Sequence, residues 1–145
     1  MNMKTIEYLK DLEYAKNEML LISCEVGWLD GVKFLVSQGA DPHFDDEGPL
    51  MVAVVHGHLD VVKYLIEECG ADPHINNDQP LFEASAWDQF EIVKYLIEKH
   101  RSDPNVCDLE LVEANGGEEI VKYIKNKIFA SKANIKNNII VIKKQ

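Results

Sequence analysis

The stretch GPLMVAVVHGHLDVVKYLIEECGADPH, residues 48–74, decides the fold because the chain contains several variants of it. Its second half, which starts at Gly57, has counterparts starting at Gly27 and Asp88, and a shortened copy covers residues 117–124. The valines that mark one equivalent position in the copies are Val32, Val62, Val93 and Val121. A period of this kind predicts a repeat protein, in which each unit packs against the next.

Each repeat unit has the pattern of two helices followed by a turn. The apolar positions of one copy are Leu59, Val62, Leu65 and Ile66, which is helical spacing. Asp60 suits the positive end of that helix, Gly70 suits its end, and Asp-Pro then stops further helix. A shorter apolar block before each copy predicts the first helix of the pair. The aromatic residues Phe34, Tyr64, Tyr95 and Tyr123 take one equivalent position per copy and should pack as a ladder along the outer helices.

The opening stretch resembles an ankyrin repeat, which reads Thr-Pro-Leu-His-x-Ala-Ala, Gly-His, a Val-Leu-Leu stripe and Gly-Ala-Asp. The second copy matches at Pro49, Leu50, Ala53, Gly57, His58, Val62, Leu65, Gly70, Ala71 and Asp72, and the third at Pro80, Leu81, Ala84, Val93, Leu96 and Asp103. The resemblance covers roughly residues 15–124. It implies an all-α ankyrin-repeat solenoid of helix-turn-helix units joined by extended, β-hairpin-like loops.

The pattern also predicts how the chain is divided. We expect an ankyrin-repeat domain over residues 1–130 and a basic tail over 131–145. The expected parts of the domain are a cap helix at 3–14 and repeats at about 15–43, 44–74, 75–105 and 106–130. The final segment NNIIVIKKQ is expected to be strand-like or disordered, and its IIVI run (139–142) could self-associate, cover the last repeat or bind a partner.

Three departures from the family pattern have structural consequences. The Thr and His of the motif become Gly48 and Met51 in one copy and Gln79 and Phe82 in the next, so the hydrogen bond they normally share should be missing. Arg101 replaces a capping glycine, at a cost of about 1 kcal/mol if the site is left-handed. The short segment 103–108 should clip the last finger loop.

Charge and composition exclude several classes of protein. The 145 residues carry a net charge of −10, and all 25 acidic residues precede residue 125, so nucleic-acid binding is not expected. The basic end could touch an anionic partner or simply be solvated. No signal peptide or membrane span is predicted, and three widely spaced cysteines favour a reducing, cytoplasmic location over a disulfide framework.

No motif in the chain points to catalysis. The sequence lacks a P-loop, a G-x-G-x-x-G and a G-x-S-x-G motif. His56 and His58 form an H-x-H, but a metal site needs three or four convergent ligands. Cys24 and Cys69 fall at apolar helical positions and should lie in the core, whereas Cys107 should be exposed in the short loop. We therefore predict no enzyme, no metal and no cofactor.

The candidate binding surface is centred on Trp87, near the end of an inner helix. Ankyrin proteins present variable residues there, on the concave face. His56 takes the equivalent place in the second copy, and Val55 and Ala86 complete the patch. The expected finger-loop residues are Phe44, Asp45, Glu47, Ile75, Asn76 and Asp78. An aromatic residue flanked by carboxylates suits a protein partner with a basic rim, although Trp87 could instead pack under the neighbouring finger.

The resemblance implies non-catalytic binding of another protein, because ankyrin domains serve as interaction scaffolds. The Lys-, Asn- and Ile-rich end suggests an AT-rich genome, such as that of a large DNA virus or intracellular bacterium, so the partner could be a host protein. A second hypothesis is an acidic decoy that mimics nucleic acid and blocks a basic defence protein. Decoy binding should weaken steeply with salt, whereas aromatic-anchored binding should not.

Overall fold

A computed structural model describes residues 3–115 and 117–143 of the protein, with side chains to residue 133. The helices are α1 (Met3–Glu25), α2 (Leu29–Ser37), α3 (Phe44–Val55), α4 (Leu59–Glu67), α5 (Ile75–Ala86), α6 (Phe90–Lys99), the 3₁₀ helix η1 (Pro104–Val106), α7 (Leu109–Ala114) and α8 (Glu118–Lys143). No strand occurs among these residues. The expected all-α solenoid is therefore confirmed.

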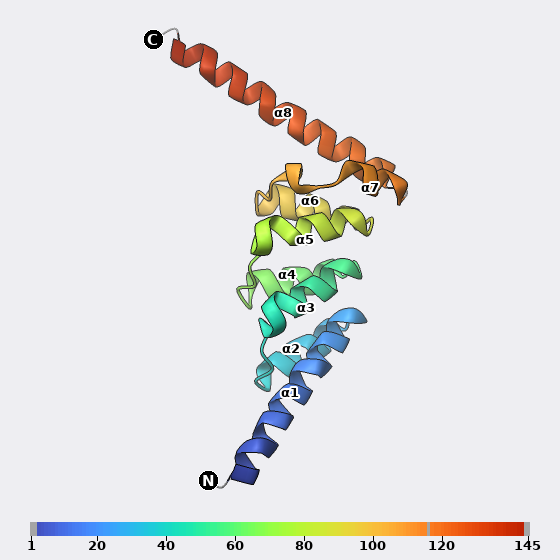
Figure 1. The fold of residues 1–145 in the computed structure, drawn as a ribbon, viewed down its shortest axis with the longest axis vertical. Helices are drawn as coiled ribbons and strands as arrows, with labels where there is room; N and C mark the ends of the chain where they lie inside the picture. Colours follow the sequence, from blue (N-terminus) through green and yellow to red (C-terminus); the bar gives the residue numbers. More distant parts are fainter. Residues whose placement is uncertain (1–2, 116, 144–145) are drawn as a thin grey trace.

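The helices form hairpins that stack in one direction (Figure 1). Helices α1, α3, α5 and α7 contact one another in sequence and form an inner row. Helices α2, α4, α6 and α8 make a second row behind them. The turns between hairpins lie along one side of the stack and the turns within hairpins along the other. Each hairpin buries its apolar face only by contacting its neighbours, which is why the sequence repeats.

One continuous core runs between the two rows of helices. The equivalent residues Leu50 and Leu81 of the inner helices are fully buried, and so are Leu65 and Leu96 of the outer helices. Val62 and Val93, which mark the period in the sequence, are also fully buried. Each period of the sequence therefore corresponds to one hairpin, which places one of these valines in the core.

The connections between hairpins differ from the expected extended loops. In the second repeat the backbone turns through three consecutive left-handed residues, Asp45, Asp46 and Glu47. The third repeat does the same at 76–78. Asp and Asn tolerate this conformation better than most residues, so a tight turn replaces the two-stranded finger. Arg101 also has a positive φ, of 61°, so a residue with a side chain occupies this left-handed cap.

Both ends of the stack differ from the expected boundaries. The segment 3–14 is not a separate cap helix but continues without interruption into the inner helix of the first repeat. Helix α8 runs to Lys143, so the described part of the tail is neither strand nor irregular. Residues 118–143 contain no Gly or Pro to stop the helix. The side chains of 139–142 lie outside the described set, and self-association through them stays a prediction.

The last finger is reduced, as its short segment indicated. The 3₁₀ helix η1 occupies residues 104–106, where the earlier repeats have their left-handed turns. The Asp103 side chain accepts a hydrogen bond from the Asn105 backbone and starts this helix. Cys107 was expected to be exposed, but it is buried because η1 packs against α5 and α8.

Candidate protein-binding surface

Two of the predicted finger residues hold the repeats together. Glu47 is only 8% exposed, and its Oε1 accepts hydrogen bonds from the His43 ring (2.8 Å) and the Asp72 amide (3.1 Å) of the next repeat. In the next repeat Asp78 accepts from the His74 ring and from the Asp103 amide. The two bonds from backbone amides cross between repeats, in a chain that lacks the Thr–His pair of the motif. The structure thus engages both carboxylates inside the stack.

The same network perturbs the titration of its members. The hydrogen bond to Glu47 raises the pKa of His43, and partial burial, which acts in the opposite direction, does not reverse this shift. For Asp78, partial burial raises the pKa, but hydrogen bonds from the Asp103 amide and His74 outweigh it and keep the value below the usual range. Hydrogen bonding therefore sets the direction of both pKa shifts, against the opposing effect of burial.

A second series of hydrogen bonds crosses the repeats at the opposite ends of the inner helices. The ring Nε2 of His58 lies 2.8 Å from the backbone oxygen of Glu25. The side-chain amide of Gln89 donates to the oxygen of Val55, and that of Asn115 donates to the oxygen of Ala86. The bonds from His58 and Gln89 join the starts of α4 and α6 to the end of the preceding inner helix. The bond from Asn115 joins the end of α7 to the end of α5. The inner-helix ends are therefore held at fixed spacing.

Three of the four aromatic residues expected in a ladder, Tyr64, Tyr95 and Tyr123, pack against the core. Tyr95 donates to Glu67 (2.8 Å) and Tyr123 donates to Glu98 (2.9 Å), each in the preceding repeat. Partial burial, with Glu67 nearby, raises the pKa of the Tyr95 phenol. Phe34 departs from the prediction, because it belongs to the first hairpin and stays 61% exposed.

An open hollow lies beside Trp87, between the inner helices α5 and α7. Trp87 is 58% exposed, and its indole nitrogen donates to the Glu83 carboxylate (3.2 Å) one turn earlier. The hollow has a volume of about 550 Å³. Its lining residues are Phe82, Glu83, Ala86, Trp87, Asp88, Leu111 and Asn115. Trp87 therefore does not pack under a finger loop, because it stands at the other end of its helix.

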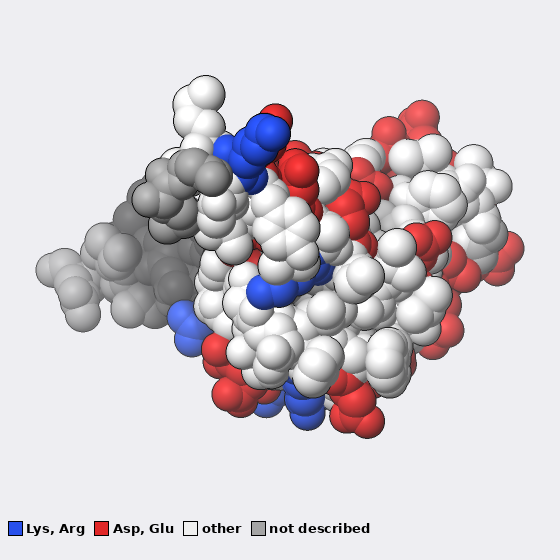
Figure 2. Space-filling model, turned by 90° about the horizontal axis from the view of Figure 1, so that it is seen from below, with Lys and Arg blue, Asp and Glu red and all other residues white. Residues whose placement is uncertain are grey.

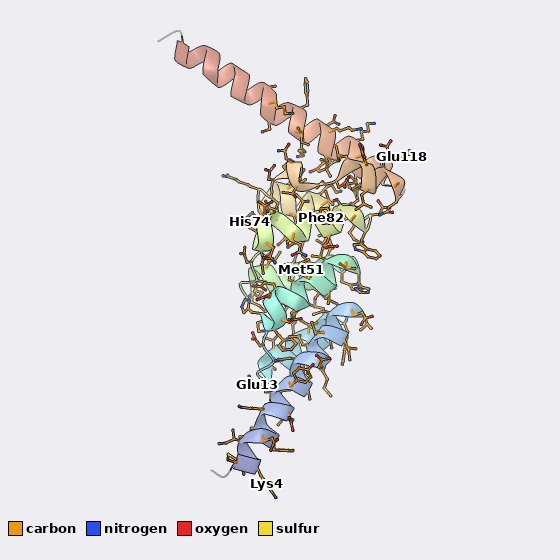
Figure 3. The ribbon with its side chains drawn as sticks, viewed as in Figure 1. Lys4, Glu13, Met51, His74, Phe82 and Glu118 are labelled. Atoms are coloured by element: carbon orange, nitrogen blue, oxygen red, sulfur yellow. The ribbon has the colours of Figure 1, made fainter. Side chains whose placement is uncertain are left out.

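The predicted site residues separate into two groups. Val55 and His56 at the end of α3 lie near Ala86 and Trp87 at the end of α5, since these helices are neighbours. The left-handed turns lie at the opposite ends of these helices, roughly 12 Å away along the right-handed part of α3 (48–55). Figure 3 shows His74 at the turn side of α5, with Phe82 and Met51 at equivalent positions along neighbouring helices.

The predicted turn residues have different environments. Asp45 and Asn76 are exposed and Ile75 is partly buried. Phe44 is also partly buried, and its ring packs edge-on against Tyr14 of α1 with 5.9 Å between centroids. This group could be reached only by a partner that approaches the turn side of the stack.

Sequence reasoning missed five residues of the hollow, namely Phe82, Glu83, Asp88, Leu111 and Asn115. A signal for two of them was present. Glu83 and Leu111 stand four residues before Trp87 and Asn115, which end the third and fourth inner helices. Residues one turn apart share a helix face, so the two pairs should line one surface.

The described residues offer no sign of metal binding or thiol chemistry. No group of three or more His, Cys, Asp or Glu side chains converges in the part of the chain that the structure covers. Burial raises the pKa of the Cys24 thiol to about 12, so it stays protonated at neutral pH and is a poor nucleophile. Cys69 is partly buried rather than fully in the core. No helix among the described residues is both long and apolar enough to cross a membrane.

Stacked helical hairpins, bridged by periodic hydrogen bonds and open along an inner row, define a solenoid repeat protein. The family model for ankyrin repeats (three copies) matches residues 2–77 and 20–108. The chain is also 34% identical over 56 residues to the putative ankyrin repeat protein L66 of Acanthamoeba polyphaga mimivirus, a match that covers 39% of this chain and 10% of that protein. The chain belongs to the ankyrin repeat family. Ankyrin repeats generally act as protein–protein interaction modules rather than catalysts.

Proposed function

We propose that the chain binds a partner protein through the inner-helix surface formed by Val55, His56, Ala86 and Trp87. The observation that carries this proposal is the exposed indole of Trp87 at the edge of the hollow. Tryptophan is strongly enriched among residues that dominate interface energies. The hydrogen bonds from Gln89 and Asn115 fix the surrounding backbone, so little conformational entropy is lost on binding.

The charges around the hollow favour a partner with basic residues at its rim. Glu83 and Asp88 flank the indole, and the chain carries a net charge of −10. Carboxylates in this position should speed encounter with a cationic surface and select against an acidic one. The similarity to a mimivirus protein supports the finer proposal that the partner belongs to a host cell. A cytoplasmic encounter is part of the same proposal and rests on the three unpaired cysteines, which suit a reducing compartment.

The test compares two aromatic-to-alanine variants in affinity capture from cell extract. Trp87→Ala should lose the retained partner, because truncating a central aromatic anchor typically costs about 2 kcal/mol or more. Phe129→Ala is the control, since Phe129 is also an exposed aromatic residue but lies on α8, away from the inner-helix surface. Equal retention of the same partner by wild type and Trp87→Ala would show that this surface is not the binding site.

Salt dependence separates this proposal from the acidic-decoy alternative. An interface anchored by Trp87 should keep most of its affinity when salt rises from about 50 to 200 mM, because apolar burial is not screened. A mimic of nucleic acid should lose on the order of a hundredfold or more over the same range. Insensitivity to Trp87→Ala combined with that loss would favour the decoy.

A further inference from the structure

Helix α1 carries an apolar stripe that the stack leaves uncovered. Its members are Tyr8, Leu12, Ala15, Met19, Ile22 and, directly after the helix, Val26. They recur at alternating steps of four and three residues, which places all of them on one face of a helix. All are exposed, although Leu20 and Cys24 on another face of the same helix are fully buried. The stripe has the pattern of a coiled-coil seam without a partner helix.

The C-terminal half of this stripe lies in a second hollow, of about 350 Å³, at the first hairpin of the stack. Trp28 and Phe34 stand on its other side, and each is 61% exposed. The equivalent residues of later repeats contact the repeat before them: His58 and Gln89 correspond to Trp28, and Tyr95 corresponds to Phe34. The hollow therefore has the position of an interface between two repeats. It carries apolar side chains where the later repeats have residues that hydrogen-bond to the preceding repeat.

The N-terminal half of α1 extends beyond the stack: before Tyr14, whose ring contacts Phe44 of α3, no other described helix lies beside it (Figure 1). Lys4 and Glu13 mark this half in Figure 3, and residues 3–15 are exposed on every side. Seen from this end, uncharged side chains occupy much of the middle of the surface and carboxylates lie along its margins (Figure 2). A single helix of about a dozen residues is marginal in water without packing. The protruding half and the hollow thus each have an apolar surface that no side chain in the described part of the chain covers.

We propose that two copies of this chain pair through α1, in antiparallel order about a two-fold axis. The protruding half of each helix then lies in the partner's hollow, with Leu12 opposite Ile22 and Tyr8 opposite Val26. A single two-fold rotation covers the protruding half and the hollow of both copies, because the two copies use the same surface. Parallel order would instead set hollow against hollow and protruding half against protruding half, so neither would fill the other.

The exposed area is sufficient for a specific dimer. The stripe residues larger than alanine, with Trp28 and Phe34, have exposed fractions between 42% and 67%. Scaled by these fractions, they offer on the order of 600–700 Å² per copy. A symmetric pair would bury on the order of 1,300 Å², which falls within the range of specific interfaces. The inner-helix surface around Trp87 is not used and stays open.

The test measures molecular mass in solution, by light scattering and sedimentation over a concentration series. The wild-type chain should be a dimer at about 10–100 µM, and Ile22→Asp should weaken dimerisation at least tenfold. Trp87→Asp is the matched control, because it puts a charge on an equally exposed apolar residue outside the stripe and should leave the dimer intact. Both variants should keep the wild-type circular dichroism spectrum.

Disulfide trapping tests the orientation. A mixture of Leu12→Cys and Ile22→Cys chains should oxidise to a mixed disulfide, because the proposed register brings the two positions together. A monomeric wild type at 100 µM would overturn the proposal and assign the hollow to a different protein. A dimer unaffected by Ile22→Asp, or one trapped mainly as a Leu12→Cys homodisulfide, would overturn it as well.

Discussion

Replacement of Glu47 by alanine is the strongest test of the claim that this side chain holds repeats together. The carboxylate is 8% exposed and accepts from the His43 ring at 2.8 Å and from the Asp72 amide at 3.1 Å. Hydrogen bonds to a charged group each contribute about 1.5–3 kcal/mol, and their loss leaves the Asp72 amide without its acceptor. Glu47→Ala should therefore reduce the free energy of unfolding by about 2–4 kcal/mol. The midpoint of thermal unfolding should fall by roughly 10 °C.

The measurement is thermal and urea unfolding followed by circular dichroism, with hydrogen exchange at the Asp72 amide as a local readout. Glu47→Gln should lose less stability, because its side-chain oxygen can still accept from that amide. Asp46→Ala is the matched control: it removes a carboxylate from the same left-handed turn, where the side chain is exposed. If Glu47→Ala unfolds within 1 kcal/mol of Asp46→Ala and exchange at Asp72 is unchanged, the scaffold role is wrong.

Three further predictions concern the core, a cap and the acid limb of stability. Leu65→Ala should cost about 3 kcal/mol in urea unfolding, because the side chain is fully buried and its removal leaves a cavity. Arg101→Gly should raise the free energy of urea unfolding by about 1 kcal/mol, since a φ of 61° is unfavourable for a residue with a side chain. The depressed pKa of Asp78 predicts stability that is present above pH about 3.9 and lost as the pH falls through the folded-state value. Asp78→Asn should have a lower free energy of unfolding at neutral pH than wild type, and this difference should shrink at low pH. If the free energy of unfolding of the two proteins depends on pH in the same way, the prediction is wrong.

The positions that form the proposed binding surface could be located from the sequence, because equivalent residues of successive repeats take equivalent places in the stack. Trp87 and His56 end equivalent helices, so their shared location follows from alignment of the copies. Leu111 could have been added by the same rule. The roles of Glu47 and Asp78 could not, because each carboxylate accepts a backbone amide from the following repeat, about 25 residues away. No local sequence pattern predicts the direction of a side chain in a turn whose backbone is left-handed.

The sequence by itself determined the stacked hairpins, since helical spacing of apolar residues and a period near thirty residues leave few other ways to bury Val62 and Val93. Only the tertiary structure decided the ends of the stack. A periodic pattern specifies what packs between two repeats, but the first hairpin has a repeat on one side only. The chain therefore reads as core-like around Phe34 and Ile22, and the neighbours present in space determine that these residues are exposed.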